Sequence, residues 1–279
     1  MTDLLMRTLP DAIATRTLAP NDIRSRFLVE NLFVEGAIAL ELVDLDRVIL
    51  GAAIPLKDAL TLPTPAAIRS NYFCERRELG ILNIGGPGSV SVDNDEWQLG
   101  VSDVLYVGRG AQTVRFGSEH ASNPARFYIV SYPAHATHPT ARVRASEASA
   151  TELGSTENAN RRTVRRYIHL AGARSAQLVM GVTTLAPGSV WNTMPVHTHD
   201  RRTEVYLYFN LAPDAMLVHL MGEPEHTQHL IVRNEQVALS PGWSIHCGCG
   251  TSAYSFCWAM GGENQDYADM DPVSMETLR

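Results

Sequence analysis

MPVHTHDRRTEVYLYF, from Met194 to Phe209, carries the clearest structural pattern in the sequence. His197 and His199 stand two residues apart in it, and Glu204 follows. Residues two apart on a β-strand face the same side, so two imidazoles can reach one ion from one strand. From Glu204 onward, polar and apolar residues alternate. This alternation predicts a strand with one face toward a barrel interior and the other toward a core between sheets.

Most of the remaining chain also reads as short β-strands. Segments such as 46–56, 79–86, 125–132 and 176–185 are rich in branched and aromatic residues, and turn-forming residues bound many of them. Many short strands at regular spacing are typical of a sandwich or barrel. Helix signals are sparse, and the clearest is residues 19–30, with Asn21 or Asp22 as the capping residue.

The two halves of the chain resemble each other in sequence. Residues 74–86 and 199–210 each carry an acid, two arginines and a glutamate before a strand, and 102–114 resembles 235–247. Such a repeat predicts two β-barrels of one kind, and the fold class is therefore all-β: two jelly-roll-like barrels with few short helices.

The polar, small-residue stretch 140–162 predicts a connection between the two barrels. The expected domains are 1–139, a barrel with an N-terminal extension, the connection at 140–162, and a second barrel at 163–279. Only the second barrel holds a full set of metal-binding side chains. The first offers Tyr72 or Cys74, Glu78 and Gln112 at the nearest matching places, which predicts a degenerate copy.

His246 is the fourth candidate ligand, because it follows a strand and a Pro-Gly turn that could fold it back beside His197 and His199. Three imidazoles and one carboxylate suit zinc, iron, manganese, cobalt or nickel, and such a site leaves a position for substrate or water. Alternation places Cys247 and Cys249 on the face opposite His246, so we expect small buried residues there.

Two further histidines, His226 and His229, fall in EPEHTQH (223–229), which is typical of a solvated hairpin, and His219 precedes it. We expect none of the three to bind metal.

Composition excludes several classes of function. A net charge of −7 argues against a nucleic-acid partner, because no basic surplus exists to meet phosphates. Lys57 is the only lysine, so Schiff-base chemistry would depend on it alone. The N-terminal stretch lacks the pattern of a signal peptide, and no apolar run is long enough to span a membrane. With only four cysteines, the expected location is the cytoplasm.

The metal-ligand pattern resembles the two metal motifs of the cupin family, with one departure. Cupins usually carry glycine three residues before the last histidine, where this chain has Trp243 and places Gly242 one residue earlier. Longer strings, such as WNTMPVHTHDRR, SPGWSIH and YFCERRELGILNIGG, resemble the 4-deoxy-L-threo-5-hexosulose-uronate ketol-isomerase family, also called 5-keto-4-deoxyuronate isomerases. The resemblance covers nearly the whole chain.

The resemblance implies a two-barrel cupin that holds one zinc ion through His197, His199, Glu204 and His246, and that assembles as a homohexamer. It also implies an aldose–ketose isomerase of pectin and uronate breakdown. A base would remove a proton from a hydroxyl-bearing carbon to give an enediol, while a divalent ion stabilises the charge that builds on oxygen.

The base and the partner of the substrate carboxylate stay open at this point. Glu263, Tyr206, Tyr208 and Glu235 are the candidate bases. Arginine suits a carboxylate because its planar fork binds both oxygens. The candidate carboxylate-binding residues are Arg161, Arg162, Arg201 and Arg202.

Three other readings compete with the uronate isomerase. One is the related two-barrel isomerase that acts on 5-deoxyglucuronate in inositol breakdown. Another is an iron-dependent cupin dioxygenase, which would consume oxygen. The last is a non-catalytic sugar-binding bicupin, which the intact set of three histidines and one glutamate argues against.

Overall fold

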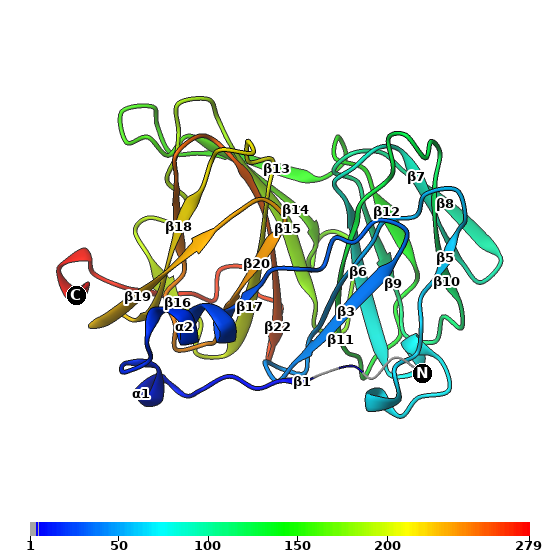
Figure 1. The fold of residues 1–279 in the computed structure, drawn as a ribbon, viewed down its shortest axis with the longest axis horizontal. Coiled ribbons are helices and arrows are strands. Elements are labelled where there is room, and N and C mark those ends of the chain that lie inside the picture. The colour runs from blue at the N-terminus through cyan, green and yellow to red at the C-terminus, as the bar shows by residue number, and fades with distance from the viewer. Residues whose placement is uncertain (1–3, 5) are drawn as a thin grey trace. The chain divides into compact units, whose positions relative to one another are not determined.

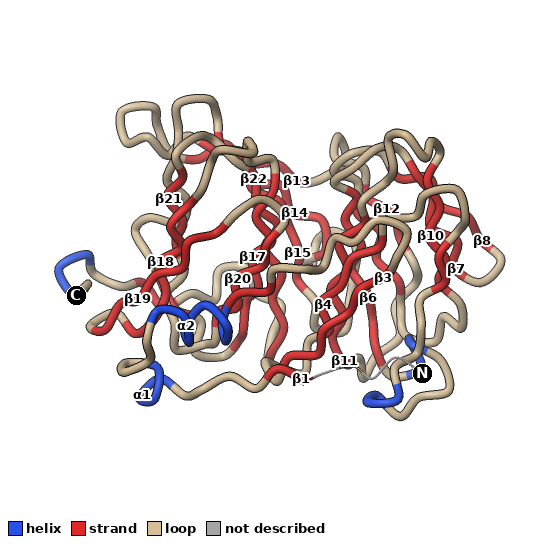
Figure 2. Tube along the Cα trace, in the orientation of Figure 1, coloured by secondary structure: helices blue, strands red, loops and turns tan. Residues whose placement is uncertain are grey.

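The computed structural model describes residue 4 and residues 6–279, and strands make up most of the regular structure (Figures 1 and 2). The N-terminal stretch that we predicted to lack a secretion signal lies partly outside the described residues. The prediction of an all-β protein with few short helices is confirmed. The helical segments are α1 (Ala12–Thr15), α2 (Pro20–Phe27), η1 (Ala66–Ile68), η2 (Phe73–Glu75) and η3 (Met275–Thr277).

The chain forms two compact units that interleave along the sequence. The first contains Asn31–Ser149, Tyr167–Met180 and the described residues up to Arg7. The second contains Thr8–Glu30, Ala150–Arg166 and Gly181–Arg279. The ranges predicted from sequence follow the chain in order, whereas the compact units exchange residues 8–30 and 167–180.

The first unit has two sheets. The order of the seven-stranded sheet is β1 (Met6–Arg7), β3 (Ile38–Val43), β4 (Ile49–Ala53), β11 (Phe127–Pro133), β6 (Arg77–Asn83), β9 (Val104–Val107) and β12 (Ala141–Val143). The order of the four-stranded sheet is β5 (Leu60–Thr61), β10 (Val114–Ser118), β7 (Gly88–Val92) and β8 (Asp95–Leu99). Apolar side chains from both sheets form one core cluster, which includes Leu79, Ile81, Val90 and Phe116.

Most of another seven-stranded sheet belongs to the second unit. Its order is β13 (Ser149–Leu153), β14 (Arg162–Ile168), β15 (Val179–Leu185), β22 (Ser255–Gly262), β17 (Arg202–Phe209), β20 (Gln236–Ser240) and β2 (Leu28–Val29). The unit also has a three-stranded sheet in the order β19 (His226–Val232), β18 (Leu217–Glu223) and β21 (Cys247–Gly250). A two-stranded sheet consists of β16 (His197–Thr198) and β23 (Asp271–Pro272).

The strand orders confirm the internal repeat. In the large sheets, β11-β6-β9 of the first unit corresponds to β22-β17-β20 of the second. In the smaller sheets, β10-β7-β8 corresponds to β21-β18-β19. Every pair of neighbours in these runs is antiparallel. The strand that carries Glu204 therefore occupies the position that β6 holds in the first unit.

The predicted helix exists, but its predicted cap is wrong. Helix α2 begins at Pro20, Ala19 is its capping residue without a side-chain hydrogen bond, and Asp22 lies in the first turn. Proline suits the first helical position because it has no N–H to leave unpaired there. None of the helices formed by the described residues is long and apolar enough to cross a membrane.

Candidate metal centre

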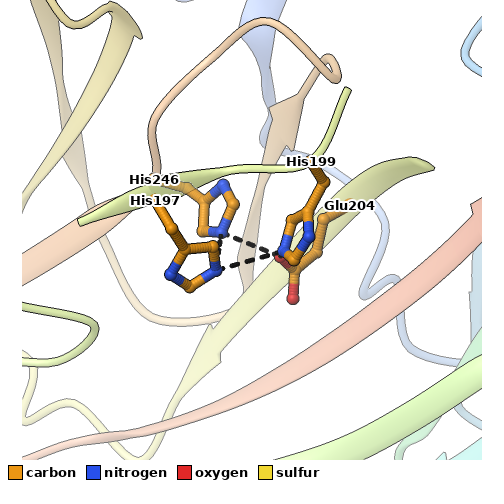
Figure 3. Close-up of side chains that lie close together, drawn as sticks. All are labelled: His197, His199, Glu204 and His246. Carbon is orange, nitrogen blue, oxygen red and sulfur yellow. Dashed lines mark hydrogen bonds and ion pairs between the residues drawn. The ribbon is translucent and has the colours of Figure 1, made fainter. Parts of the chain in front are cut away.

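Four side chains from three segments of the second unit converge on one point (Figure 3). His197 lies on β16 and His199 directly after it, Glu204 lies on β17, and His246 directly precedes β21. The ligand atoms of all four lie within 4.8 Å of one another. The pairing of β17 with its neighbouring strands and the turn before His246 thus bring together residues that are separated in sequence.

The contacts within the cluster have the spacing of a coordination shell. His197 Nε2 is 3.1 Å from His199 Nε2 and 3.0 Å from His246 Nε2. Glu204 Oε2 is 3.3 Å from His199 Nε2 and 3.0 Å from His246 Nε2. Nitrogen and oxygen atoms bound about 2.0–2.2 Å from one divalent ion lie about 3–3.5 Å from their neighbours. The four side chains therefore fit a shared divalent ion.

Hydrogen bonding supports the same conclusion. Glu204 is almost fully buried, and its Oε2 atom has no hydrogen-bond partner among the described residues apart from its contacts with the two imidazoles. A buried acceptor without a donor costs about 1–3 kcal/mol. An ion at the centre would satisfy this oxygen and the three ring nitrogens together.

The outer nitrogens of two histidines are held by other groups. His199 Nδ1 is 2.9 Å from the carbonyl oxygen of Asp269, which can only accept, so this nitrogen carries the proton and Nε2 keeps its lone pair. His246 Nδ1 is 3.1 Å from Ser240 Oγ. Such outer contacts fix ring orientation and tautomer in metal sites.

The low pKa values of two ring groups have a physical cause. Burial, reinforced by His199 and Arg202, lowers the pKa of His197 to about 3. Burial also holds the pKa of His246 well below its usual range, with the neighbouring histidines adding to the effect. Both rings are therefore neutral near pH 7, which is the form that binds metal.

The Pro-Gly turn does fold His246 back, as predicted. The Ser244 N–H donates to the Pro241 carbonyl at 2.9 Å, and the His199 N–H donates to the Gly242 carbonyl at 3.2 Å. A Cβ atom on Gly242 would lie 2.8 Å from the carbonyl oxygen of His199, so glycine allows this close approach. Although glycine stands one residue earlier than in the usual cupin pattern, the turn still brings His246 to the cluster.

A cavity of about 280 Å³ opens beside the cluster, and His197, His199 and Glu204 form part of its wall. Its apolar wall includes Phe256, Trp258, Met260 and Met270. This volume lies just under the range of about 300–1,000 Å³ that is usual for small-molecule sites, and it suits a small substrate.

Of the four candidate bases, only Tyr206 lines the cavity. Its hydroxyl is hydrogen-bonded to Thr193, and burial raises the pKa of Tyr206 well above its usual range. The Tyr208 hydroxyl is instead 2.7 Å from His219 Nδ1. Glu263 is exposed, and Glu235 sits in the turn between β19 and β20. Neither glutamate lines the cavity.

The four candidate arginines have different surroundings. Arg201 forms ion pairs with Asp269 and Asp271. Arg202 donates to the carbonyls of Asp266 and Asp269 at 2.6 and 2.5 Å. Both therefore hold the loop that carries the His199 partner.

The other two arginines are neighbours in sequence but not in setting. Arg161 is exposed, and its side chain lies outside the cavity wall. Arg162 is half-buried and lines the cavity.

The cysteines and the other histidines have no part in the cluster. Cys247 is buried, and its Sγ lies 2.8 Å from the Asn192 carbonyl, whereas Cys249 is only half-buried. His226 and His229 are exposed on the β18–β19 hairpin, as expected. His219, in contrast, is fully buried.

The sequence reasoning missed Tyr267, which also lines the cavity. Its ring lies 5.3 Å from the Trp258 ring, and the Arg166 guanidinium carbon is 5.4 Å from its centroid. Tyr267 belongs to the loop that Arg201 and Arg202 hold. The arginine pair after His199 was one local signal for this loop.

Residues 46–275 match the KduI/IolB family. The chain belongs to this family. Curated relatives in the family include the 4-deoxy-L-threo-5-hexosulose-uronate ketol-isomerases of two bacteria. That of Caldicellulosiruptor bescii is 51% identical over 95% of this chain and 96% of its own length. That of Kineococcus radiotolerans is 53% identical over 92% and 94%.

A third such relative, from Cereibacter sphaeroides, is 47% identical over the whole of both chains. The resemblance seen in the sequence is thereby confirmed.

Solved structures of low sequence identity share the fold. An IolB-like protein from Salmonella typhimurium superposes with a TM-score of 0.73 at 14% identity, over 88% of this chain and 96% of its own. Oxalate decarboxylase from Bacillus subtilis gives a TM-score of 0.56 at 10% identity, over 80% and 71%. These likenesses confirm the two-barrel, cupin-like architecture predicted for the KduI/IolB chain. The four-residue cluster of this chain suggests a divalent metal.

Proposed function

We propose that this protein is a metal-dependent aldose–ketose isomerase, an intramolecular oxidoreductase of pectin and uronate breakdown. Its substrate is 4-deoxy-L-threo-5-hexosulose uronate and its product 3-deoxy-D-glycero-2,5-hexodiulosonate. The names of relatives that are 47–53% identical over nearly the full chain support this substrate over 5-deoxyglucuronate. The observation that carries the proposal is the convergence of three imidazoles and one carboxylate beside a small cavity.

The reaction moves a proton from a hydroxyl-bearing carbon to the neighbouring aldehyde carbon, and the hydroxyl proton to the former aldehyde oxygen. Its barrier is the negative charge that develops on oxygen. A divalent ion, which we propose to be zinc held by His197, His199, Glu204 and His246, would supply Lewis-acid stabilisation of that charge. The Asp269 carbonyl and Ser240 orient two of the rings. Apolar residues of the cavity wall exclude water, which strengthens the electrostatic interactions inside.

The experiment that tests the proposal is a proton NMR time course in heavy water. Purified protein is mixed with 4-deoxy-L-threo-5-hexosulose uronate, with and without a chelator, and metal content is measured on the same sample. Conversion to the diketo acid that stops with the chelator is the expected result. Deuterium at the former aldehyde carbon is expected if the proton passes through an enediol that exchanges with solvent.

Other outcomes would redirect the assignment. A metal-loaded protein that leaves this substrate unchanged but converts 5-deoxyglucuronate would be the inositol-pathway isomerase. Oxygen uptake with an iron-loaded protein would instead identify a dioxygenase. Binding of sugar acids without any turnover would leave only a sugar-binding role.

We also propose that the chain forms a homo-oligomer, a hexamer by the family resemblance, which light scattering of the purified protein tests. The cytoplasmic location stays a prediction from sequence, and expression of the native gene product followed by cell fractionation checks it.

A further inference from the structure

Arg162 is the arginine that reaches the cavity beside the metal cluster. It begins β14, and Val164, two residues further along the same strand, also lines the cavity. Side chains two apart share one face of a strand, so this face of β14 points into the site. Arg162 thus lines the same cavity as His197, His199 and Glu204 of the four-residue cluster.

Among the residues that the structure describes, none forms an ion pair with Arg162 through a carboxylate. Its described hydrogen bond runs from Nη1 to the Asn160 carbonyl at 2.8 Å. Burial lowers the pKa of Arg162, and the groups that oppose this effect are tyrosines and a cysteine rather than carboxylates. Leaving a half-buried guanidinium without a counter-charge is costly unless a ligand supplies one.

The other three candidate arginines are less suited than Arg162 to bind the substrate carboxylate. Arg201 is occupied by two carboxylates and Arg202 by two backbone carbonyls. Arg161 is exposed and lies outside the wall. Arg162 is the member of the set that combines a cavity position with an uncompensated charge.

We propose that Arg162 binds the carboxylate of the sugar acid while the metal cluster holds the opposite, reacting end of the molecule. This inference rests on the proposed function, because the sugar acid is the substrate named there. The guanidinium fork donates two parallel hydrogen bonds to the two carboxylate oxygens. Arg162 therefore selects uronates over neutral sugars, and it fixes which end of the open chain faces the metal cluster.

The test compares Arg162→Met and Arg162→Lys with the wild-type protein, using the metal-loaded full chain. Loss of a charge-assisted, two-pronged contact is expected to raise KM about 100-fold for Arg162→Met. The lysine variant keeps the charge but not the planar fork, so its KM is expected to rise about 10-fold. Because the carboxylate is remote from the reacting carbons, kcat is expected to change much less than KM.

Arg161→Met is the matched control, because it removes the neighbouring exposed arginine and is expected to leave KM unchanged. Metal content and melting temperature of each variant report whether the fold and the cluster remain intact. Added guanidinium ion is expected to lower KM of Arg162→Met and to leave that of the wild type unchanged. A residue with a merely structural role would not respond in this way.

Two measurements separate failure of this inference from failure of the proposed function. Wild-type turnover of 4-deoxy-L-threo-5-hexosulose uronate decides the proposed function. Calorimetric titration of the same compound into wild type and Arg162→Met decides the role of Arg162. If the wild type binds the compound no more tightly than Arg162→Met does, the role of Arg162 is overturned, whether or not turnover occurs.

Discussion

Strands β6 and β17 occupy the same place in the two units, yet they turn different side chains inward. On β6, Leu79 and Ile81 belong to the apolar cluster that fills the first unit. On β17, Glu204 belongs to the four-residue cluster, and Tyr206 lines the cavity beside it. The same strand order therefore supports either a packed apolar interior or a reactive polar one. The choice depends on a few inward positions.

Glu78 on β6 is a buried glutamate, like Glu204 on β17, but it has a structural role. Glu78 is fully buried and accepts hydrogen bonds from the backbone N–H groups of residues 176–178 and from the Tyr106 hydroxyl. All these donors belong to its own unit. Its oxygens are fully used by the fold, whereas the Oε2 atom of Glu204 has no donor among the described residues beyond the two imidazoles it contacts.

The largest expected effect comes from breaking the polar interior. In the double variant His197→Ala/His199→Ala, the protein is expected to lose bound metal, and kcat/KM is expected to fall at least about 10³-fold, because the ion contributes several kcal/mol to the transition state. Metal analysis and the NMR assay measure both. The matched change in the first unit is Gln112→Ala, the exposed position aligned with His246, which should alter neither quantity. Retained activity in the double variant would refute the metal role.

The next effect comes from breaking the apolar interior. Ile81→Ala removes a fully buried side chain from the core cluster and is expected to lower the free energy of unfolding by about 2–5 kcal/mol. Urea denaturation measures it. Metal content per folded chain should not change, since the ligands lie in the other unit. If Ile81→Ala lost metal but not stability, the apolar interior of the first unit would contribute to metal binding rather than to stability.

A smaller expected effect is a loss of folding stability at acid pH. Burial lowers the pKa of His219 to about 3, whereas an unfolded histidine titrates near 6.5. Below pH 6.5, His219 binds a proton in the unfolded chain but stays neutral in the folded one. The free energy of unfolding therefore falls as pH decreases toward 3, by about 1.4 kcal/mol per pH unit for this site. Urea denaturation of metal-free protein between pH 7 and 5 measures the slope.

His219→Gln supplies the control for this pH dependence, because it keeps a hydrogen-bonding group near Tyr208 but does not titrate. Its unfolding free energy should depend less steeply on pH than that of the wild type. Equal slopes for the two proteins would mean that His219 is not buried in its neutral form.

The smallest effect concerns the loop that bears Asp269. Arg201→Met removes the ion pairs to Asp269 and Asp271 but leaves the Asp269 carbonyl bonded to Arg202 and His199. Metal affinity is expected to fall less than about 10-fold, below the roughly 10–100-fold typical of groups that touch a ligand directly. Competition with a chelator measures the affinity. A loss comparable to that of the double histidine variant would place Arg201 within the cluster itself.

Local sequence patterns predicted much of the fold and part of the four-residue cluster. Alternation along 204–210 predicted the inward face of β17, and the His-x-His spacing predicted a shared point for two rings. The repeat of an acid, two arginines and a glutamate before a strand predicted two barrels of one kind. These inferences succeed because strand periodicity and turn chemistry act over a few residues.

The all-β class, the repeat and the shared face of His197 and His199 could be predicted from sequence, because each depends on patterns that extend over a few residues. The approach of His246 to this pair also required the Pro-Gly turn and the pairing of distant strands. Tertiary contacts determine which arginine faces the cavity, that Tyr267 and not Glu263 lies in its wall, and that Ala19 rather than Asn21 or Asp22 caps α2. Those outcomes depend on how loops distant in sequence meet the barrel. Arg161 and Arg162 are identical in type and adjacent in the chain, yet the strand that starts at Arg162 turns one of them toward the cavity and leaves the other exposed.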